Sequence, residues 1–358
     1  MTANIAAHYL NGLLLAHNRP ITLGRKRSAD GGTADVKFRN AQTLTTKRNI
    51  YQISGLGLQL NKKIGADMKN WDINRLSGAL GAEVQGIDLA TVSSNDIAEI
   101  RRLLAEHMVL FFPQQNLSVE DHVALGRHFG KLEGHPNLKN PYLDHPEVFE
   151  LVASNGGVAD EWHTDLTFQE QPSLMSILNM VKCPETGGDT MWTNLCTAFD
   201  ALSPPMQELC TGLTALHDAL PHNHPEQMAI HPVVRIHPET GRKALYVNEH
   251  FTRRIVEMNA PESAALLDFL TGWVQNPRFT VRYRWSQGAI GIWDNRCTQH
   301  YVLNDFSEER VIQRVTVVGD QPTGEGARWP AWLNDGRRSA VSRHDRQLAL
   351  FLKSRNQD

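Results

Sequence analysis

"EWHTDLTF", residues 161–168, places His163 and Asp165 two positions apart among apolar and β-favouring residues. In a β-strand alternate side chains point to the same face, so His163 and Asp165 would lie side by side, while Trp162 and Thr164 face the opposite way. The chain has 16 histidines, so one His-x-Asp triplet is expected by chance. The triplet predicts part of a metal site only if the rest of the chain supplies another ligand.

Segments with the composition of short β-strands make up much of the chain from residue 146 onward. They are VFELVAS (148–154), SLMSILNMV (173–181), HPVVRIHP (231–238), KALYVN (243–248), FTVRYRW (279–285), AIGIWD (289–294) and VIQRVTVVG (311–319). Helical stretches around 197–216 and 262–275 interrupt them. Because strands and helices do not alternate regularly, the pattern predicts a mainly β fold with flanking helices, barrel-like or jelly-roll in type.

The sequence before residue 130 predicts an α+β arrangement of helices and strands and contains no candidate catalytic or metal-binding motif. Glycines divide "LSGALGAEVQGIDLA", residues 76–90, into a pair of strands. Ser94 or Asn95 can cap a helix, and "MVLFF" at 108–112 follows it as a buried strand. Ser118 then opens a second helix, through a capping box with Asp121, that continues to Phe129.

Composition excludes several classes of protein. The formal charge of −3 gives no basic footprint of the kind that nucleic-acid-binding proteins carry. No apolar run approaches the roughly 18 residues that a membrane helix requires. The four cysteines have no metal-ligand spacing and are too few for a disulfide scaffold, which favours a reducing, cytoplasmic compartment.

The two ends of the chain differ from the middle. Residues 1–70 are basic and poor in acidic and aromatic residues, so they cannot readily build a core. This extension has three possible interpretations: a targeting peptide, a disordered tail, or sequence ahead of a true start at Met68. Residues 71–322 form the predicted domain. Residues 323–358 form a polar tail with a possible short helix at 344–353.

A metal bound by His163 and Asp165 requires a third ligand from a neighbouring strand, as in the octahedral iron sites of two histidines and one carboxylate. His300 is the best candidate because it follows the apolar strand 289–294, and binding groups favour the ends of strands. Its competitors are five histidines in one region, His217, His222, His224, His231 and His237. His222-x-His224 could itself begin a zinc site.

Arg314 lies in an alternating segment where Arg310, Ile312 and Arg314 would share one face. A guanidinium inside a buried strand needs an anionic partner, because burying it unpaired would cost several kcal/mol. From the residues alone, the anion is either an internal carboxylate or a bound dicarboxylate.

Several motifs in order resemble the taurine dioxygenase family of Fe(II)/2-oxoglutarate-dependent dioxygenases. They are "WHTDLTF" (162–168), "GGDTMWTN" (187–194), "HPVVRIHPETGRKALYVNEHFTRRI" (231–255), "WDNRCTQH" (293–300) and the Arg314 strand. The resemblance runs from about Trp71 to Pro322. It implies a double-stranded β-helix, or jelly roll, in which His163, Asp165 and His300 hold the iron.

The resemblance also implies roles for further residues. Arg314 and Thr190 would hold the distal carboxylate of 2-oxoglutarate, although Thr190 alone suggests a turn hydroxyl. The substrate pocket would be lined by His135, Phe251 and Arg310. No catalytic residue beyond the metal ligands is implied. With Fe(II), 2-oxoglutarate and O2, the enzyme would hydroxylate the carbon beside a heteroatom of a small anionic substrate, giving an aldehyde, succinate and CO2 in sulfur metabolism.

The substrate differs from taurine in this interpretation. Taurine-oxidising members carry a tyrosine and an asparagine where this chain has Leu138 and Ala159, and the lid segment from His217 to His231 is short. We therefore expect an alkyl sulfate ester or a longer alkyl sulfonate. Alternatives are an aryloxyalkanoate dioxygenase and a non-catalytic zinc-binding jelly-roll protein. A homo-oligomer is possible.

Overall fold

The computed structural model describes residues 71–137, 144–155, 159–333 and 343–355. The chain divides into two units, residues 1–66 and 67–358, and every described residue belongs to the second. The predictions for residues 1–70 and for Leu138 lie outside the described residues.

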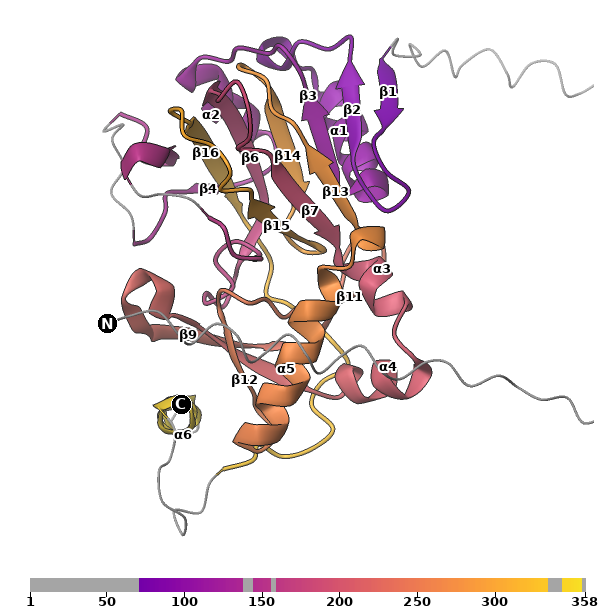
Figure 1. Cartoon of the computed structure of the whole chain (residues 1–358), viewed down its shortest axis with the longest axis vertical. Helices are drawn as coiled ribbons and strands as arrows, with labels where there is room; N and C mark the ends of the chain where they lie inside the picture. The colour runs from indigo at the N-terminus through magenta and orange to yellow at the C-terminus, as the bar shows by residue number, and fades with distance from the viewer. Residues whose placement is uncertain (1–70, 138–143, 156–158, 334–342, 356–358) are drawn as a thin grey trace, which may run out of the picture. The chain divides into compact units, whose positions relative to one another are not determined.

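A long sheet of eight strands forms the back of the domain in Figure 1. Its order is β1 (Asp72–Arg75), β2 (Ala82–Gln85), β3 (Val109–Phe112), β14 (Ile290–Asp294), β6 (Ser173–Lys182), β16 (Val311–Val318) and β4 (Leu132–Glu133), with β5 (Val148–Val152) also paired to β16. Neighbouring strands are antiparallel except for β2 and β3, which are parallel. Strands distant in sequence thus meet at the centre of this sheet.

A short sheet lies in front of the long one in Figure 1 and carries one of the predicted ligands. Its order is β13 (Thr280–Tyr283), β7 (Thr190–Asn194) and β15 (Thr298–Val302). The sheets pack through aromatic rings: Phe111 of β3 stacks on Tyr283 at 3.7 Å between centroids and meets the edge of Trp192 at 5.1 Å. Two packed antiparallel sheets of this kind are a jelly roll, as the sequence predicted.

The remaining elements surround this sandwich. The helices are α1 (Ser94–His107), α2 (Val119–Arg127), α3 (Leu195–Asp200), α4 (Pro204–Thr211), α5 (Ala260–Val274) and α6 (Arg343–Arg355). Two smaller sheets join β12 (Thr252–Ile255), β8 (Thr214–Ala219) and β9 (His224–Pro232), and β10 (Val234–Ile236) with β11 (Lys243–Leu245). Short 3₁₀ turns are η1 (Leu89–Thr91), η2 (Ala153–Asn155), η3 (Leu220–His222) and η4 (Pro277–Phe279).

Helices α1 and α2 cover one face of the long sheet. Ser93 caps α1 in a reciprocal capping box with Asp96, one residue before the predicted cap. The helix buries Ile97, Ile100, Leu103 and Leu104 in a core shared with β3, β14 and β16. Ser118 caps α2 as predicted by accepting a hydrogen bond from the Asp121 N–H, and α2 ends at Arg127, two residues early. None of the described helices is long and apolar enough to cross a membrane.

Three predicted elements are wrong in their bounds. The stretch 161–168 is not a strand, because His163 alone forms a bridge and the chain turns from Asp165 onward, with a left-handed φ of 56° at Leu166. The helix predicted at 197–216 divides into α3 and α4 and ends in β8, because the Pro204–Pro205 pair can begin a helix but not continue one. The first strand of the N-terminal pair is β1, which lies ahead of the predicted segment.

Residues 323–333 continue along the domain. The backbone N–H groups of Arg328 and Trp332 donate to the carbonyls of Gly212 and Val256. Helix α6 then covers the predicted helix 344–353, and its Gln347 side chain donates to the carbonyl of Pro225.

Candidate metal centre and pocket

A backbone bridge brings the two histidines of the predicted site together. The N–H of His163 donates to the carbonyl of His300 at 3.1 Å, and the N–H of His300 donates back to His163 at 2.8 Å. The two rings lie 4.0 Å apart between centroids. His300 is not at the end of the apolar strand β14, as expected, but at the centre of β15, in the short sheet beyond the turn 295–297.

The turn that follows His163 places the carboxylate beside these rings. Asp165 Oδ1 lies 3.9 Å from His163 Nε2. One donor atom from each of His163, Asp165 and His300 falls within 4.8 Å of the others, and all three side chains are buried. The predicted triplet and the predicted third ligand therefore converge on one point.

The protonation states of this group suit a metal ion. Burial lowers the pKa of His163 to about 4, against a smaller opposite effect of Asp165, and it also lowers the pKa of His300 well below its usual value. Burial raises the pKa of Asp165, but Arg314, the two histidines and Ser176 lower it more, so the carboxyl pKa lies below its usual range. Neutral imidazoles and an ionised carboxylate are the forms that bind divalent metals.

Each of the two histidines has a ring nitrogen that is available to bind a metal. His163 Nδ1 donates to the carbonyl of Glu161 at 2.8 Å, which fixes the ring and leaves Nε2 as the free lone pair. The Nδ1 atom of His300 is buried without a hydrogen-bond partner in the structure. The donor set thus fits a metal ion.

A cavity of about 410 Å³ adjoins the three ligands, a size typical of small-molecule sites. All five residues predicted for the cosubstrate or the substrate line it, namely His135, Thr190, Phe251, Arg310 and Arg314. His250 and Phe149 also line the cavity and were not predicted from the sequence, and His222, which lines it too, was considered only as a metal ligand. No spacing in the sequence relates these three residues to the triplet, because loops and separate strands bring them in.

The two pocket arginines have different partners. Arg310 Nε donates to the carbonyl of Gly188 at 3.1 Å, and its Nη2 lies 3.4 Å from the hydroxyl of Thr190. Its guanidinium has no carboxylate partner among the described residues, and burial lowers its pKa to about 10. Arg314 instead pairs with Asp165 at 2.6 Å. Thr190 therefore contacts Arg310, whereas Arg314 forms an ion pair with the candidate metal ligand Asp165.

The other histidines of the sequence analysis do not form a competing centre. Thr167 and Thr252 hydroxyls contact His217 Nδ1, and His231 Nε2 contacts the carbonyls of Thr167 and Gln169. His224 contacts Glu226. Among the described residues, no three of the histidines between 217 and 237 share a metal-sized site.

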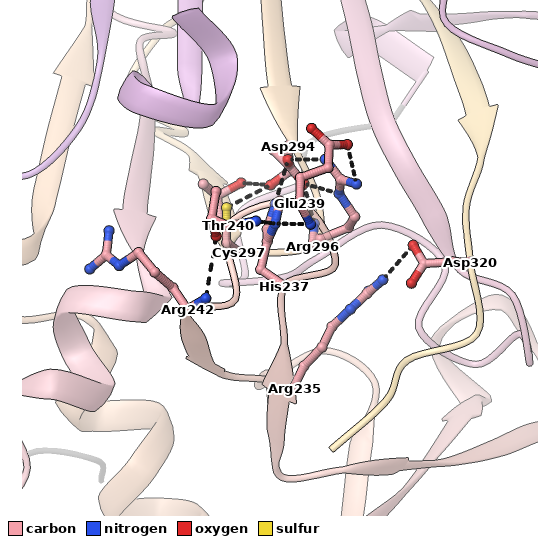
Figure 2. A network of polar contacts seen from close by, with 10 residues as sticks. Arg235, His237, Glu239, Thr240, Arg242, Asp294, Arg296, Cys297 and Asp320 are labelled. Carbon is pink, nitrogen blue, oxygen red and sulfur yellow. Dashed lines mark hydrogen bonds and ion pairs between the residues drawn. The ribbon is translucent and has the colours of Figure 1, made fainter. Parts of the chain in front are cut away.

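A second buried group, His237 with Asp294 and Cys297, has the spacing of a metal site but is already occupied by hydrogen bonds (Figure 2). Asp294 accepts from the N–H, Nε and Nη2 of Arg296 and from His237 Nε2. His237 Nδ1 accepts from the backbone N–H groups of Glu239 and Thr240. Both ring nitrogens of His237 are hydrogen-bonded and Arg296 neutralises the carboxylate, so the network stabilises the turn before β15 and leaves no imidazole nitrogen free for a metal.

A buried group of two histidines and one carboxylate beside open space is the ligand set of the non-haem iron oxygenases. Residues 72–316 match the family model described as taurine catabolism dioxygenase TauD, TfdA family, so the chain belongs to this family of 2-oxoglutarate-dependent dioxygenases.

The match to this chain extends over most of the length of several similar proteins. An alkylsulfatase of Acinetobacter baylyi is 37% identical over 70% of this chain and 86% of its own. An alpha-ketoglutarate-dependent sulfate ester dioxygenase of Pseudomonas putida is 34% identical over 71% and 91%. The crystal structure of a taurine dioxygenase from Burkholderia xenovorans superimposes with a TM-score of 0.65 at 38% identity, covering 71% of this chain and 93% of that one.

Proposed function

We propose that this protein is an Fe(II)-dependent dioxygenase that uses O2 and 2-oxoglutarate to hydroxylate the carbon beside the heteroatom of an alkyl sulfate ester or alkyl sulfonate. The observation that carries the proposal is the convergence of His163, Asp165 and His300 at a cavity that also holds two arginines. The names of the relatives, an alkylsulfatase and a sulfate ester dioxygenase, support this substrate class.

His163, Asp165 and His300 would hold the iron, whose contribution is to activate O2 and to orient the cosubstrate. With only three protein ligands, the metal would keep coordination positions open for small molecules. The protein's own contribution is the position of the substrate carbon and the exclusion of bulk water by the buried wall of the cavity.

The distal carboxylate of 2-oxoglutarate was predicted to lie on Thr190 and Arg314, and the contacts favour Arg310 in place of Arg314. The Thr190 hydroxyl receives hydrogen bonds from Trp285 Nε1 at 2.9 Å and from Arg310, so its own hydrogen is left to donate. A donating hydroxyl beside a guanidinium without an anionic partner is a binding site for a carboxylate.

The substrate's anionic head group would then meet Arg314 and His135. Burial lowers the pKa of His135 to about 3, and its Nδ1 accepts from the N–H of Asn137, which leaves Nε2 as a neutral donor. Leu151, Ala159 and Val302 provide an apolar wall for an alkyl chain. Each methylene buried there would contribute about 0.8 kcal/mol, whereas the ammonium of taurine would lack a partner.

A substrate panel tests the proposal. Succinate formation is measured with Fe(II) and 2-oxoglutarate in the presence of a medium-chain alkyl sulfate, the matching sulfonate, taurine or an aryloxyacetate. We expect the alkyl sulfate or sulfonate to give the highest kcat/KM, with release of an aldehyde and sulfate or sulfite. Preference for the aryloxyacetate, with release of a phenol, would assign the chain to the alternative branch, and no stimulation by any compound would contradict the proposal.

We further infer a cytoplasmic location, supported by four cysteines that are all free thiols. A homo-oligomeric state remains a prediction that size-exclusion chromatography can test.

A further inference from the structure

A buried serine donates to the candidate carboxylate ligand. Ser176 lies on the central strand β6, and its hydroxyl donates to Asp165 Oδ2 at 2.8 Å. Both side chains are buried. The other carboxylate oxygen, Oδ1, lies 3.9 Å from His163 Nε2 and accepts a hydrogen bond from Arg314 Nη1 at 2.6 Å.

The serine belongs to a chain of hydrogen bonds that starts at Trp293 on β14 and passes through Asn295 in the turn before β15. Trp293 Nε1 donates to Asn295 Oδ1 at 3.0 Å, and Asn295 Nδ2 donates to Ser176 Oγ at 3.0 Å. The N–H of Asn295 also donates to the carbonyl of Leu174, which fixes the turn to β6. The side chains of Trp293, Asn295 and Ser176 are fully buried or nearly so.

The direction of every hydrogen in this chain follows from its two ends. An indole can only donate, so the amide oxygen of Asn295 must face Trp293 and its NH₂ must face Ser176. An ionised carboxylate can only accept, so the single hydrogen of Ser176 must point at Asp165. Asn295 occupies a lone pair of the hydroxyl and thereby prevents it from turning away.

We propose that Ser176, directed by Asn295, is a positioning residue that holds Asp165 with Oδ1 facing the metal. The proposal rests on the metal site of the proposed function, because it concerns the orientation of one of its ligands. The hydroxyl holds Oδ2 on the β6 side, so Oδ1, which also accepts from Arg314, is the oxygen that faces His163 and the proposed ion. Partners of this kind outside the ligand set typically change metal affinity about 10- to 100-fold when they are removed.

The test measures binding of Mn(II) alone to the full-length protein, by the loss of the free Mn(II) signal in electron paramagnetic resonance. Ser176→Ala should raise the Kd for Mn(II) by about tenfold or more. Ser173→Ala is the matched control, because Ser173 lies on the same strand, is fully buried, and its hydroxyl has no hydrogen-bond partner among the residues that the structure describes. The control should bind Mn(II) like the wild type.

Asp165→Ala separates the two proposals. If wild type binds Mn(II), Asp165→Ala does not, and Ser176→Ala matches the wild type, the positioning role is wrong and the metal site stands. If Asp165→Ala binds like the wild type, the metal site itself is wrong. Should Ser176→Ala not fold, Asn295→Ala decides: a weaker Mn(II) affinity supports the role, and an unchanged affinity overturns it.

Discussion

At the scale of single residues, the candidate ligand His163 differs from His237 in what its ring nitrogens contact. His163 uses one nitrogen to fix its ring and keeps the other toward the cavity, whereas both nitrogens of His237 are hydrogen-bonded within the protein. Counting histidines in the sequence cannot make this distinction, since it depends on neighbours supplied by other strands.

His300→Ala should abolish Fe(II)-dependent succinate formation while leaving the fold intact, because one of three ligands is lost and nearby core contacts remain. Far-ultraviolet circular dichroism checks the fold, and succinate is measured by chromatography. His224→Ala is the control, since His224 is partly exposed and contacts Glu226 outside the cavity. Activity retained in the first variant and lost in the second would place the metal elsewhere.

Arg310→Lys should raise the KM for 2-oxoglutarate more than Arg314→Lys does, because lysine keeps the charge but cannot make the planar two-point contact. A lost charge-assisted hydrogen bond corresponds to about 1.5–3 kcal/mol, or roughly ten- to more than a hundredfold. Arg314→Lys should chiefly raise the KM of the sulfate or sulfonate. The reverse pattern would restore the assignment of Arg314 to the cosubstrate that the sequence suggested.

At the scale of elements, α2 is joined to the central strand of the long sheet by a buried histidine. His122 Nε2 donates to the carbonyl of Ile177 on β6 at 2.9 Å. Burial lowers its pKa to about 4, although the hydrogen bond to Ile177 acts in the opposite direction. The helix therefore packs on the sheet with this imidazole in its neutral form.

The burial of this imidazole makes the free energy of unfolding depend on pH. The imidazole has a pKa of 6.5 in the unfolded chain and about 4 in the folded protein. Its contribution to the free energy of unfolding is therefore complete above pH 6.5 and is lost as the pH falls toward 4. Between pH 7 and pH 5 the loss is about 2 kcal/mol. His122→Gln should reduce this loss in urea unfolding, while His128→Gln, at an exposed position, should keep it. An equal loss in His122→Gln and wild type would contradict the assignment.

The sequence predicted most of the elements, because alternating and helical periodicities report burial directly: β3, β5, β6, β14, β16 and α5 all lie where expected. The prediction failed where hydrogen bonds of side chains determine the backbone conformation. Thr164 donates to the carbonyl of Thr298, and Asp165 accepts from Ser176, so the triplet needs one bridge and a turn instead of a strand. The partners of Arg310 and Arg314 could not be predicted from the sequence either, because they depend on which face of β16 and its flanking residues meets β7.

At the scale of the whole molecule, the match to the family model begins at residue 72 and ends at residue 316. The candidate metal ligands and the residues that line the cavity lie within these bounds. A chain that lacks residues 1–70 should therefore keep the kcat and KM of the full chain. A fall in kcat without loss of the folded signal would assign the basic extension a part in turnover.

The backbone bridge between His163 and His300 sets the order of events during synthesis. A growing chain that has just produced His163 and Asp165 holds two donors, and the third belongs to β15, close to the end of the domain. Under the proposed function, high-affinity metal uptake would therefore wait until nearly the entire domain has left the ribosome. Once bound, the ion stabilises the finished sandwich by mass action, so iron shortage would leave completed but more easily unfolded chains for proteases to remove.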